Sequence, residues 1–157
     1  MNVVFESAKV EDAASIVEAR SKSFYDDFIK YGECPGYNIP LETMKKRISN
    51  GIIYKIVYDG KLIGDISIKK KDNQVYKLGC LAIIPEFQNR GIGKDALRFI
   101  YQTYPDAAKW ELDTPVQDER NCYFYEKDGY HKVSDQIISD RLTIRTYEKN
   151  KKTTLPC

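Results

Sequence analysis

Residues 80–97 read Cys-Leu-Ala-Ile-Ile-Pro-Glu-Phe-Gln-Asn-Arg-Gly-Ile-Gly-Lys-Asp-Ala-Leu and carry most of the structural information in this chain. The opening apolar run ends at Pro85, and from Ile92 onward apolar residues recur at helical spacing. A strand therefore leads through a short loop into a helix whose first turn contains Gly91 and Gly93. Glycine leaves the backbone N–H groups of such a turn uncovered, and these groups have no partners inside the helix. The pattern predicts an anion site.

Arg90 and Lys94 flank this turn and add full positive charges to the partial charge of the helix dipole. The predicted site therefore suits a phosphate or a diphosphate. A P-loop is excluded as the source of the pattern. Gln88 stands where the first glycine of a P-loop belongs, and Asp95 follows the lysine in place of a hydroxyl residue.

A dinucleotide fingerprint is a second interpretation. Gly91, Gly93 and Ala96 satisfy G-x-G-x-x-A, and Asp113 follows about 20 residues later, where a ribose-binding acid belongs. In that fingerprint, however, the first glycine forms the tight turn that leaves the strand. Here residues 85–90 intervene, and the upstream sequence is typical of hairpins and not of a βαβ succession. A nicotinamide-dependent oxidoreductase is therefore disfavoured, and a binding assay can test it.

The loop resembles the signature of the GNAT superfamily, the acyl-CoA-dependent N-acetyltransferases. Gln88-Asn-Arg-Gly-Ile-Gly93 matches Q/R-x-x-G-x-G/A, and Ile83-Ile-Pro85 stands where the family has V-x-P. The resemblance implies that the loop and first helical turn bind the diphosphate of acetyl-CoA, and that the preceding strand binds pantetheine through its backbone. The implied coenzyme-binding residues are Leu81, Ala82, Ile83, Gln88, Asn89, Arg90, Gly91, Ile92, Gly93, Lys94 and, from a second motif, Asn121.

The second motif covers residues 121–130, Asn-Cys-Tyr-Phe-Tyr-Glu-Lys-Asp-Gly-Tyr, and resembles the family's F/L-Y-E-K-x-G-F/Y. The family's tyrosine falls on Tyr125, which is implied to protonate the departing thiolate. Its reference pKa of about 10 keeps a tyrosine protonated at neutral pH. A ring that only packs between helix and sheet is the alternative. Asp118 and Asn121 both remain candidates for the family's pantetheine-binding Asn.

The general base of an acetyl transfer is left open by the sequence. Many family members carry a Glu four residues ahead of the V of V-x-P, and Gly79 occupies that place here. The role cannot be carried over to this chain. Asp65, Glu111, Asp113 or a chain of water molecules remain as candidates.

The rest of the chain follows the element order of a GNAT domain. Asp59-Gly60 predicts a two-residue hairpin turn, and residues 69–74 predict a polar turn. The order is β-α-α-β-β-β-α-β-α-β-β, an α/β (α+β) fold with helices flanking a mixed, mostly antiparallel central sheet. Strands are expected at 2–7, 52–58, 61–69, 75–84, 109–113 (parallel to 75–84), 130–139 and 142–149, and helices at 10–32, 40–50, 91–105 and 118–127.

Composition limits the remaining possibilities. The 157 residues suit one domain over residues 1–150, followed by a basic tail at 151–157 that we expect to be disordered. A net charge of +2 gives no field that would gather nucleic acid, and no stretch predicts a membrane span. Four cysteines without a C-x-x-C pair, and a single histidine, favour reduced thiols in a cytoplasmic protein over a metal site or a disulfide framework.

Together these features predict direct transfer of an acetyl group from acetyl-CoA to a primary amine of a small molecule or peptide. A non-catalytic acyl-CoA-binding regulatory module is the alternative, and pairing of two chains stays open. An acidic, aromatic cluster near the end of the first helix would suit a second cationic group on the acceptor, although a solvated helix end explains it equally well. Its members are Tyr25, Asp26, Asp27, Tyr31 and Glu33.

Overall fold

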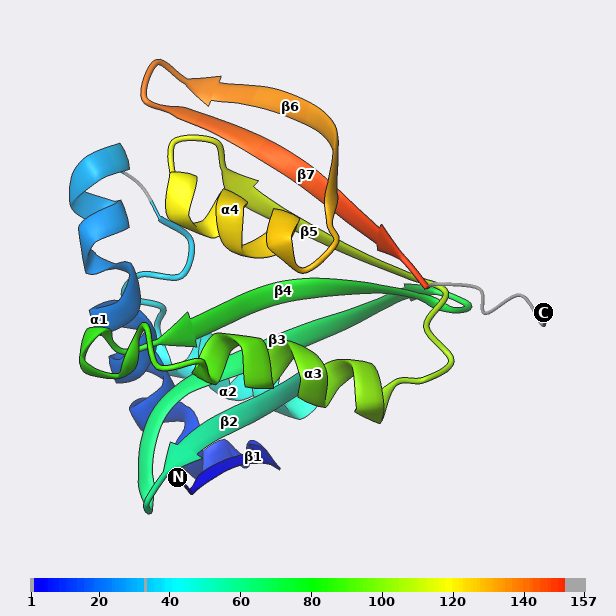
Figure 1. The fold of residues 1–157 in the computed structure, drawn as a ribbon. Helices are drawn as coiled ribbons and strands as arrows, with labels where there is room; N and C mark the ends of the chain where they lie inside the picture. Colours follow the sequence, from blue (N-terminus) through cyan, green and yellow to red (C-terminus); the bar gives the residue numbers. More distant parts are fainter. Residues whose placement is uncertain (1, 33, 152–157) are drawn as a thin grey trace. The chain divides into compact units, whose positions relative to one another are not determined.

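The computed structural model describes residues 2–32 and 34–151. Its strands form a seven-stranded sheet in the order β1-β2-β3-β4-β5-β7-β6 (Figure 1). The strands are β1 (Val3–Ser7), β2 (Ile52–Tyr58), β3 (Lys61–Asp72), β4 (Val75–Ile83), β5 (Lys109–Pro115), β6 (His131–Ser139) and β7 (Leu142–Asn150). The helices are α1 (Ala13–Tyr31), α2 (Leu41–Asn50), α3 (Ile92–Thr103) and α4 (Glu119–Lys127), and short 3-10 turns precede α1 (Val10–Asp12) and follow β4 (Pro85–Phe87). The predicted fold class and element order are confirmed.

Two local predictions that position these strands are also confirmed. Asp59 and Gly60 have φ angles of 46° and 84°, as a tight hairpin turn between β2 and β3 requires. The strands β4 and β5 run parallel, with Val75 opposite Lys109 at the start of the ladder. All other strand pairs whose registers are described are antiparallel.

The polar turn predicted at residues 69–74 is wrong over most of its length. Strand β3 continues to Asp72, and only Asn73 and Gln74 form the turn before β4. The strand end could not be predicted because its lysine run lacks the alternation of apolar and polar residues that indicates a strand. Its side chains are exposed, and Lys71 Nζ lies 2.8 Å from Glu111 Oε2 on β5, an interaction that depends on a residue 40 positions away.

The chain divides into two compact units. The first holds the described residues up to Lys69 together with Gly79–Tyr104, and the second holds Lys70–Leu78 and the described residues from Pro105 onward. A single domain over residues 1–150 stays a prediction. The disorder predicted for the tail concerns residues that, apart from Lys151, lie outside the described part of the chain.

In the first unit, α3 lies in front of the strands and α2 lies behind them in Figure 1. One apolar cluster joins α1 and α2 to β2 through Ile16 and Met44, which are both fully buried. A second cluster includes Ile63 on β3 and Ile92 at the start of α3. Buried apolar contacts of Ile92 therefore hold the first turn of α3 against the sheet.

In the second unit, α4 lies over β5 and β7 (Figure 1). The fully buried Tyr147 on β7 donates a 2.6 Å hydrogen bond from its hydroxyl to Glu126 Oε2. Lys149 Nζ lies 3.0 Å from Asp128 Oδ2 at the end of the helix. The acidic residues of the second sequence motif thus tie α4 to the strand beneath it.

Candidate functional site

The loop before α3 has the backbone that the glycine pattern predicts. Asn89 and Gly91 have φ angles of 63° and 82°, and Gly91 is the N-cap of α3. No side chain of the described residues caps this helix start. A Cβ at Gly91 would meet nothing within 4 Å, so the space above the loop is open and the left-handed φ is the reason for glycine. The first N–H groups of a helix have no acceptor within it, so an uncapped start of this kind suits an anion.

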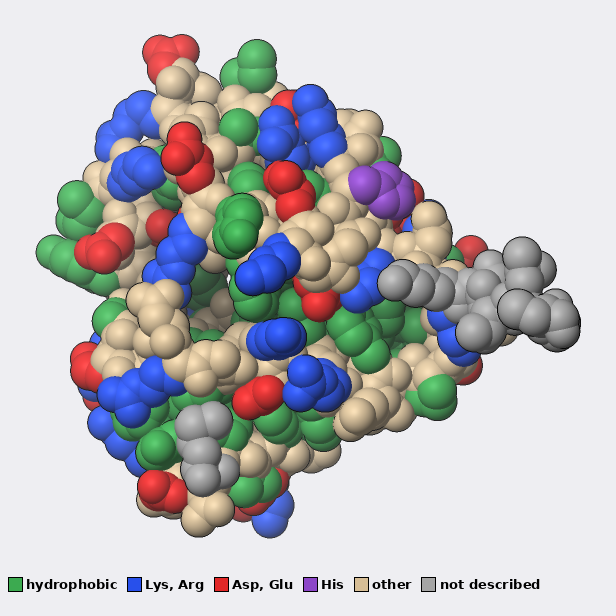
Figure 2. Space-filling view, in the orientation of Figure 1, with side chains coloured by type: hydrophobic (Ala, Val, Ile, Leu, Met, Phe, Trp, Pro, Cys, Tyr) green, Lys and Arg blue, Asp and Glu red, His purple; other side chains and the backbone are tan. Residues whose placement is uncertain are grey.

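Two cations stand beside this helix start. The Arg90 guanidinium lies 4.9 Å from the centre of the Phe87 ring, which orients the side chain within the loop. Lys94 belongs to the first turns of α3. Figure 2 shows basic side chains gathered over the beginning of α3 and the loop before it. Arg90 and Lys94 therefore place positive charge beside the uncapped helix start.

The end of β4 is held in place by neighbours within the first unit. Gln88 Nε2 donates a 2.8 Å hydrogen bond to the carbonyl of Ile83, and the N–H of Ile84 donates one of 2.9 Å to the carbonyl of Ile63. On β3, a Cβ at Gly64 would lie only 1.9 Å from the carbonyl oxygen of Ala82. The side chain of Gln88 thus braces the strand end that leads into the loop.

The side chains of the three β4 residues predicted to bind the coenzyme serve the fold. Ala82 is buried, and Leu81 and Ile83 are half-buried hydrophobics packed against the second apolar cluster. We therefore expect a ligand to use mainly their peptide groups. This is compatible with recognition through the backbone, for which side-chain identity matters little.

The second motif lies on α4. Tyr125 is buried, and its ring makes edge contacts with Phe124 and Tyr130 at centroid distances of 5.1 and 5.7 Å. Asp118 is the N-cap, and its carboxylate accepts a 3.1 Å hydrogen bond from the N–H of Asn121. The carboxylate of Asp118 is therefore engaged in capping α4. The amide side chain of Asn121, on the first turn, remains as the candidate for binding pantetheine.

Each candidate base is engaged in an ion pair. Asp65 on β3 is fully buried, and Arg20 on α1 binds both its carboxylate oxygens, with distances of 3.0 Å from Nε to Oδ1 and 2.7 Å from Nη2 to Oδ2. Glu111 lies 2.8 Å from Lys71 Nζ. Asp113 lies 2.7 Å from Lys77 Nζ and accepts a 2.8 Å hydrogen bond from the Thr146 hydroxyl.

The pKa values of two of these carboxylates are shifted in opposite directions. Hydrogen bonding from Lys71 is the main reason that the pKa of Glu111 is lowered. Burial raises the pKa of Asp65, and the charge and hydrogen bonds of Arg20 oppose that rise. Burial also raises the pKa of the Cys80 thiol to about 12, so this thiol is protonated at neutral pH and is a poor nucleophile.

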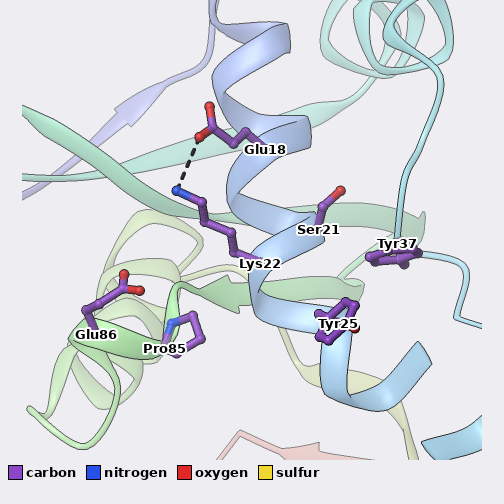
Figure 3. A pocket seen from close by; sticks show the side chains of 7 residues that line it. All are labelled: Glu18, Ser21, Lys22, Tyr25, Tyr37, Pro85 and Glu86. Atoms are coloured by element: carbon purple, nitrogen blue, oxygen red, sulfur yellow. Dashed lines mark ion pairs between the residues drawn. The ribbon is translucent and has the colours of Figure 1, made fainter. Parts of the chain in front are cut away.

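A pocket of about 460 Å³ lies along α1 in the first unit (Figure 3). Of the predicted acidic, aromatic cluster, only Tyr25 lines it; Tyr31 is buried, and Glu33 lies outside the described residues. The spacing along α1 was a signal that sequence reasoning missed, because four lining residues recur three or four positions apart on one helix face. The pocket is lined by Glu18, Ser21, Lys22, Tyr25, Tyr37, Pro85 and Glu86.

Two further findings concern the described residues alone. Within 2–32 and 34–151, no group of three or more His, Cys, Asp or Glu side chains is arranged to hold a metal ion. In the same part of the chain, no helix combines the length and hydropathy that a membrane span would require.

Comparison with known proteins identifies the family of this chain through a family model. Residues 14–130 match the family model described as Acetyltransferase (GNAT) family. An uncharacterized protein of Bacillus subtilis, YrkN, is 30% identical over 137 residues, which cover 83% of this chain and 74% of YrkN.

Solved structures show the same fold at low sequence identity. An acetyltransferase from Thermus thermophilus superposes with a TM-score of 0.79 at 15% identity, covering 96% of this chain and 98% of the other. The PaiA N-acetyltransferase from Thermoplasma acidophilum, crystallised in complex with coenzyme A, gives a TM-score of 0.72 at 19% identity, covering 96% and 100%. The loop, the second motif and the matching family model together place this chain in the GNAT acetyltransferase family.

Proposed function

We propose that the protein is an N-acetyltransferase that moves an acetyl group from acetyl-CoA to a primary amine of a small molecule or peptide. The observation that carries the proposal is the start of α3, which has no side-chain cap and opens with Gly91; it follows the end of β4, held by Gln88, through a short turn and loop. Acetyl-CoA, the co-substrate of the family, supplies an activated acetyl group as a thioester. The residues present fit its diphosphate, because open N–H groups and two cations meet at one helix start.

Direct transfer needs a neutral amine, a polarised carbonyl and a proton for the departing sulfur. The amine nitrogen forms a bond to the acetyl carbon as the carbon–sulfur bond breaks. We assign carbonyl polarisation to the N–H of Ile83, because Gln88 and Ile63 fix the strand end around it. We assign proton donation to Tyr125, because the phenol of tyrosine, with a reference pKa of about 10, is a suitable general acid. Positioning carries much of the remaining rate enhancement.

Water is the base that the geometry favours. Hydrogen bonding from Lys71 lowers the pKa of Glu111, Asp65 is buried and inaccessible to an amine, and Asp113 is engaged by Lys77 and Thr146. Gly79 carries no side chain at the position where many family members place a Glu. We therefore propose that the acceptor ammonium loses its proton to a water chain. For the coenzyme arm we favour Asn121, since Asp118 is committed to capping α4.

The coenzyme site is tested by replacing Gly91 with Glu. The added carboxylate would repel the diphosphate and cover the helix start, so acetyl-CoA binding should become undetectable by calorimetry. Gly60→Glu is a matched control, because Gly60 has a φ of 84°, has nothing within 4 Å of its Cβ position, and lies in the β2–β3 turn. Equal acetyl-CoA affinity in Gly91→Glu and Gly60→Glu would remove the loop from the site.

The role of Tyr125 is tested by Tyr125→Phe. Loss of a general acid should lower kcat by about 100-fold or more, while the Kd of acetyl-CoA changes little. Tyr123→Phe, an exposed neighbour on the same helix, is the control. If kcat is unchanged, Tyr125 has a packing role only. Coenzyme binding without thiol release from any amine tested would favour the non-catalytic module.

A further inference from the structure

A buried hydroxyl in the second unit joins α4 to the hairpin of β6 and β7. Tyr147 on β7 is fully buried, and this strand lies beneath α4, the helix that carries Tyr125 (Figure 1). The Tyr147 hydroxyl lies 2.6 Å from Glu126 Oε2 on the helix. Arg145, two residues earlier on β7, forms a second side-chain hydrogen bond with the same hydroxyl. One phenol therefore links both elements.

The hydrogen bonds of this phenol have a single direction. Arginine has only donors, so the Tyr147 oxygen accepts from Arg145 and its proton points to the carboxylate of Glu126. Burial raises the pKa of Tyr147, so the hydroxyl keeps this proton at neutral pH. Arg145 is held in turn by Asp135 on β6, at 2.9 Å from Nε to Oδ1. A chain of directed contacts thus runs from β6 through β7 to α4.

The helix meets this phenol on two successive turns. Cys122 is buried four positions before Glu126, and it also interacts with the Tyr147 hydroxyl. Residues four positions apart share one face of a helix, so contacts at both restrict rotation of α4 about its axis and sliding along it. Tyr125 directly precedes Glu126 in the helix. The direction in which its side chain leaves α4 therefore depends on how Glu126 is held.

We propose that Tyr147 is a positioning residue for acetyl transfer, which binds Glu126 and so fixes α4 at the rotation that presents the Tyr125 hydroxyl to the departing thiolate. The inference rests on the proposed function, in which Tyr125 is the general acid. The two neighbouring residues of the second motif then have separate tasks. Tyr125 donates the proton, and Glu126 anchors the helix without taking part in proton transfer. Precise placement matters because a shift of about 1 Å can cost about 100-fold in rate.

The first test removes the hydroxyl of Tyr147 and keeps its ring. Thiol release from acetyl-CoA is measured with the most reactive of butylamine, phenethylamine and Nα-acetyllysine as acceptor. Tyr147→Phe should lower kcat by about tenfold and leave the Kd of acetyl-CoA nearly unchanged. Tyr76→Phe is the matched control, because Tyr76 is also buried in the second unit and donates a 3.0 Å hydrogen bond to Asp106. Equal kcat values in the two variants would overturn the proposal.

A double-mutant cycle shows whether Tyr147 acts through Tyr125. Tyr147→Phe should slow the wild type but hardly slow the Tyr125→Phe variant, because the hydroxyl that needs positioning is absent there. A general loosening of the fold would slow both backgrounds by the same factor. That result would overturn the proposal.

The anchor is also tested from the side of the helix. Glu126→Gln keeps a carbonyl oxygen that can accept the hydrogen bond of Tyr147, so it should retain most of the wild-type kcat. Glu126→Ala has no acceptor and should lose as much as Tyr147→Phe. Equal losses in the two Glu126 variants would assign this residue a role through its charge and would contradict the proposal.

The same measurements separate this inference from the proposed function. If Tyr125→Phe lowers kcat and Tyr147→Phe does not, the positioning role is refuted and acetyl transfer with Tyr125 as the acid stands. If Tyr125→Phe leaves kcat unchanged, the acid role of Tyr125 fails and the positioning role fails with it. Absence of thiol release from the wild type with all three amines would refute both acetyl transfer to these amines and the positioning role.

Discussion

The two compact units both use charged side chains to hold secondary structure together, with different physical consequences. In the first unit, Arg20 and Asp65 form a pair between α1 and β3 that is 4% and 0% exposed. In the second unit, Arg145 and Asp135 form a 2.9 Å pair between β7 and β6, but 21% and 30% of these side chains are exposed. Loss of one partner leaves an uncompensated buried charge in the first case, whereas water solvates the remaining charge in the second.

The largest effect should follow from breaking the buried pair. Asp65→Ala leaves the Arg20 guanidinium buried without its partner and should lower the free energy of unfolding by about 3–5 kcal/mol. Urea unfolding followed by circular dichroism measures this difference. Asp135→Ala is the matched control and should shift the midpoint far less. Similar losses in the two variants would show that burial does not distinguish the pairs.

The double variant Arg20→Met with Asp65→Leu sharpens the same comparison. It removes both charges and restores apolar volume, so much of the stability lost in Asp65→Ala should return. If the double variant is as unstable as Asp65→Ala, the loss of stability comes from altered packing and not from the unpaired charge of Arg20.

A smaller effect is expected where β3 and β4 approach closely in the first unit. The Cβ of Gly64→Ala would lie 1.9 Å from the carbonyl oxygen of Ala82, so the backbone of β4 must move. We expect a loss of roughly 1–3 kcal/mol and weaker acetyl-CoA binding. Gly79→Ala is the control, because its Cβ would meet the rotatable Ser67 hydroxyl at 3.1 Å. Unchanged acetyl-CoA affinity in Gly64→Ala would show that coenzyme binding does not depend on the position of the end of β4.

The smallest effect concerns pH and the exposed pair of the second unit. Hydrogen bonding from Arg145 lowers the pKa of Asp135 to about 2 in the folded protein. Because the folded pKa lies below the unfolded value of about 3.9, the pair stabilises the fold above that value. The contribution is lost as the pH falls through about 2. The unfolding midpoints of the wild type and Asp135→Asn should therefore differ slightly at neutral pH and converge in acid; a constant difference would contradict the assignment.

Local features of this molecule could be predicted from its sequence. Residues that are close in the chain determine the loop at Gln88–Gly93, the hairpin turn at Asp59-Gly60 and the start of α3. Glycine is needed at Gly91 because its φ angle is positive. Side-chain pairs between distant residues could not be predicted. Arg20 and Asp65 are 45 positions apart, and no local pattern indicates that they pair.

The same distinction applies to the candidate site. The loop that we propose to bind the diphosphate could be found in the sequence because its residues lie in one segment. The pocket combines Tyr37 and Glu86 with one face of α1, so sequence reasoning found only Tyr25 among its lining residues. The extra length of β3 was missed because Lys71, near its end, pairs with Glu111 on another strand.

The central claim is that peptide N–H groups at the start of α3 bind the coenzyme. A crystal structure of the protein grown with CoA tests it most directly. The account predicts diphosphate oxygens within hydrogen-bonding distance of the backbone nitrogens between Gly91 and Lys94. Clear density for CoA at any other place, with this helix start facing only solvent, would contradict the account.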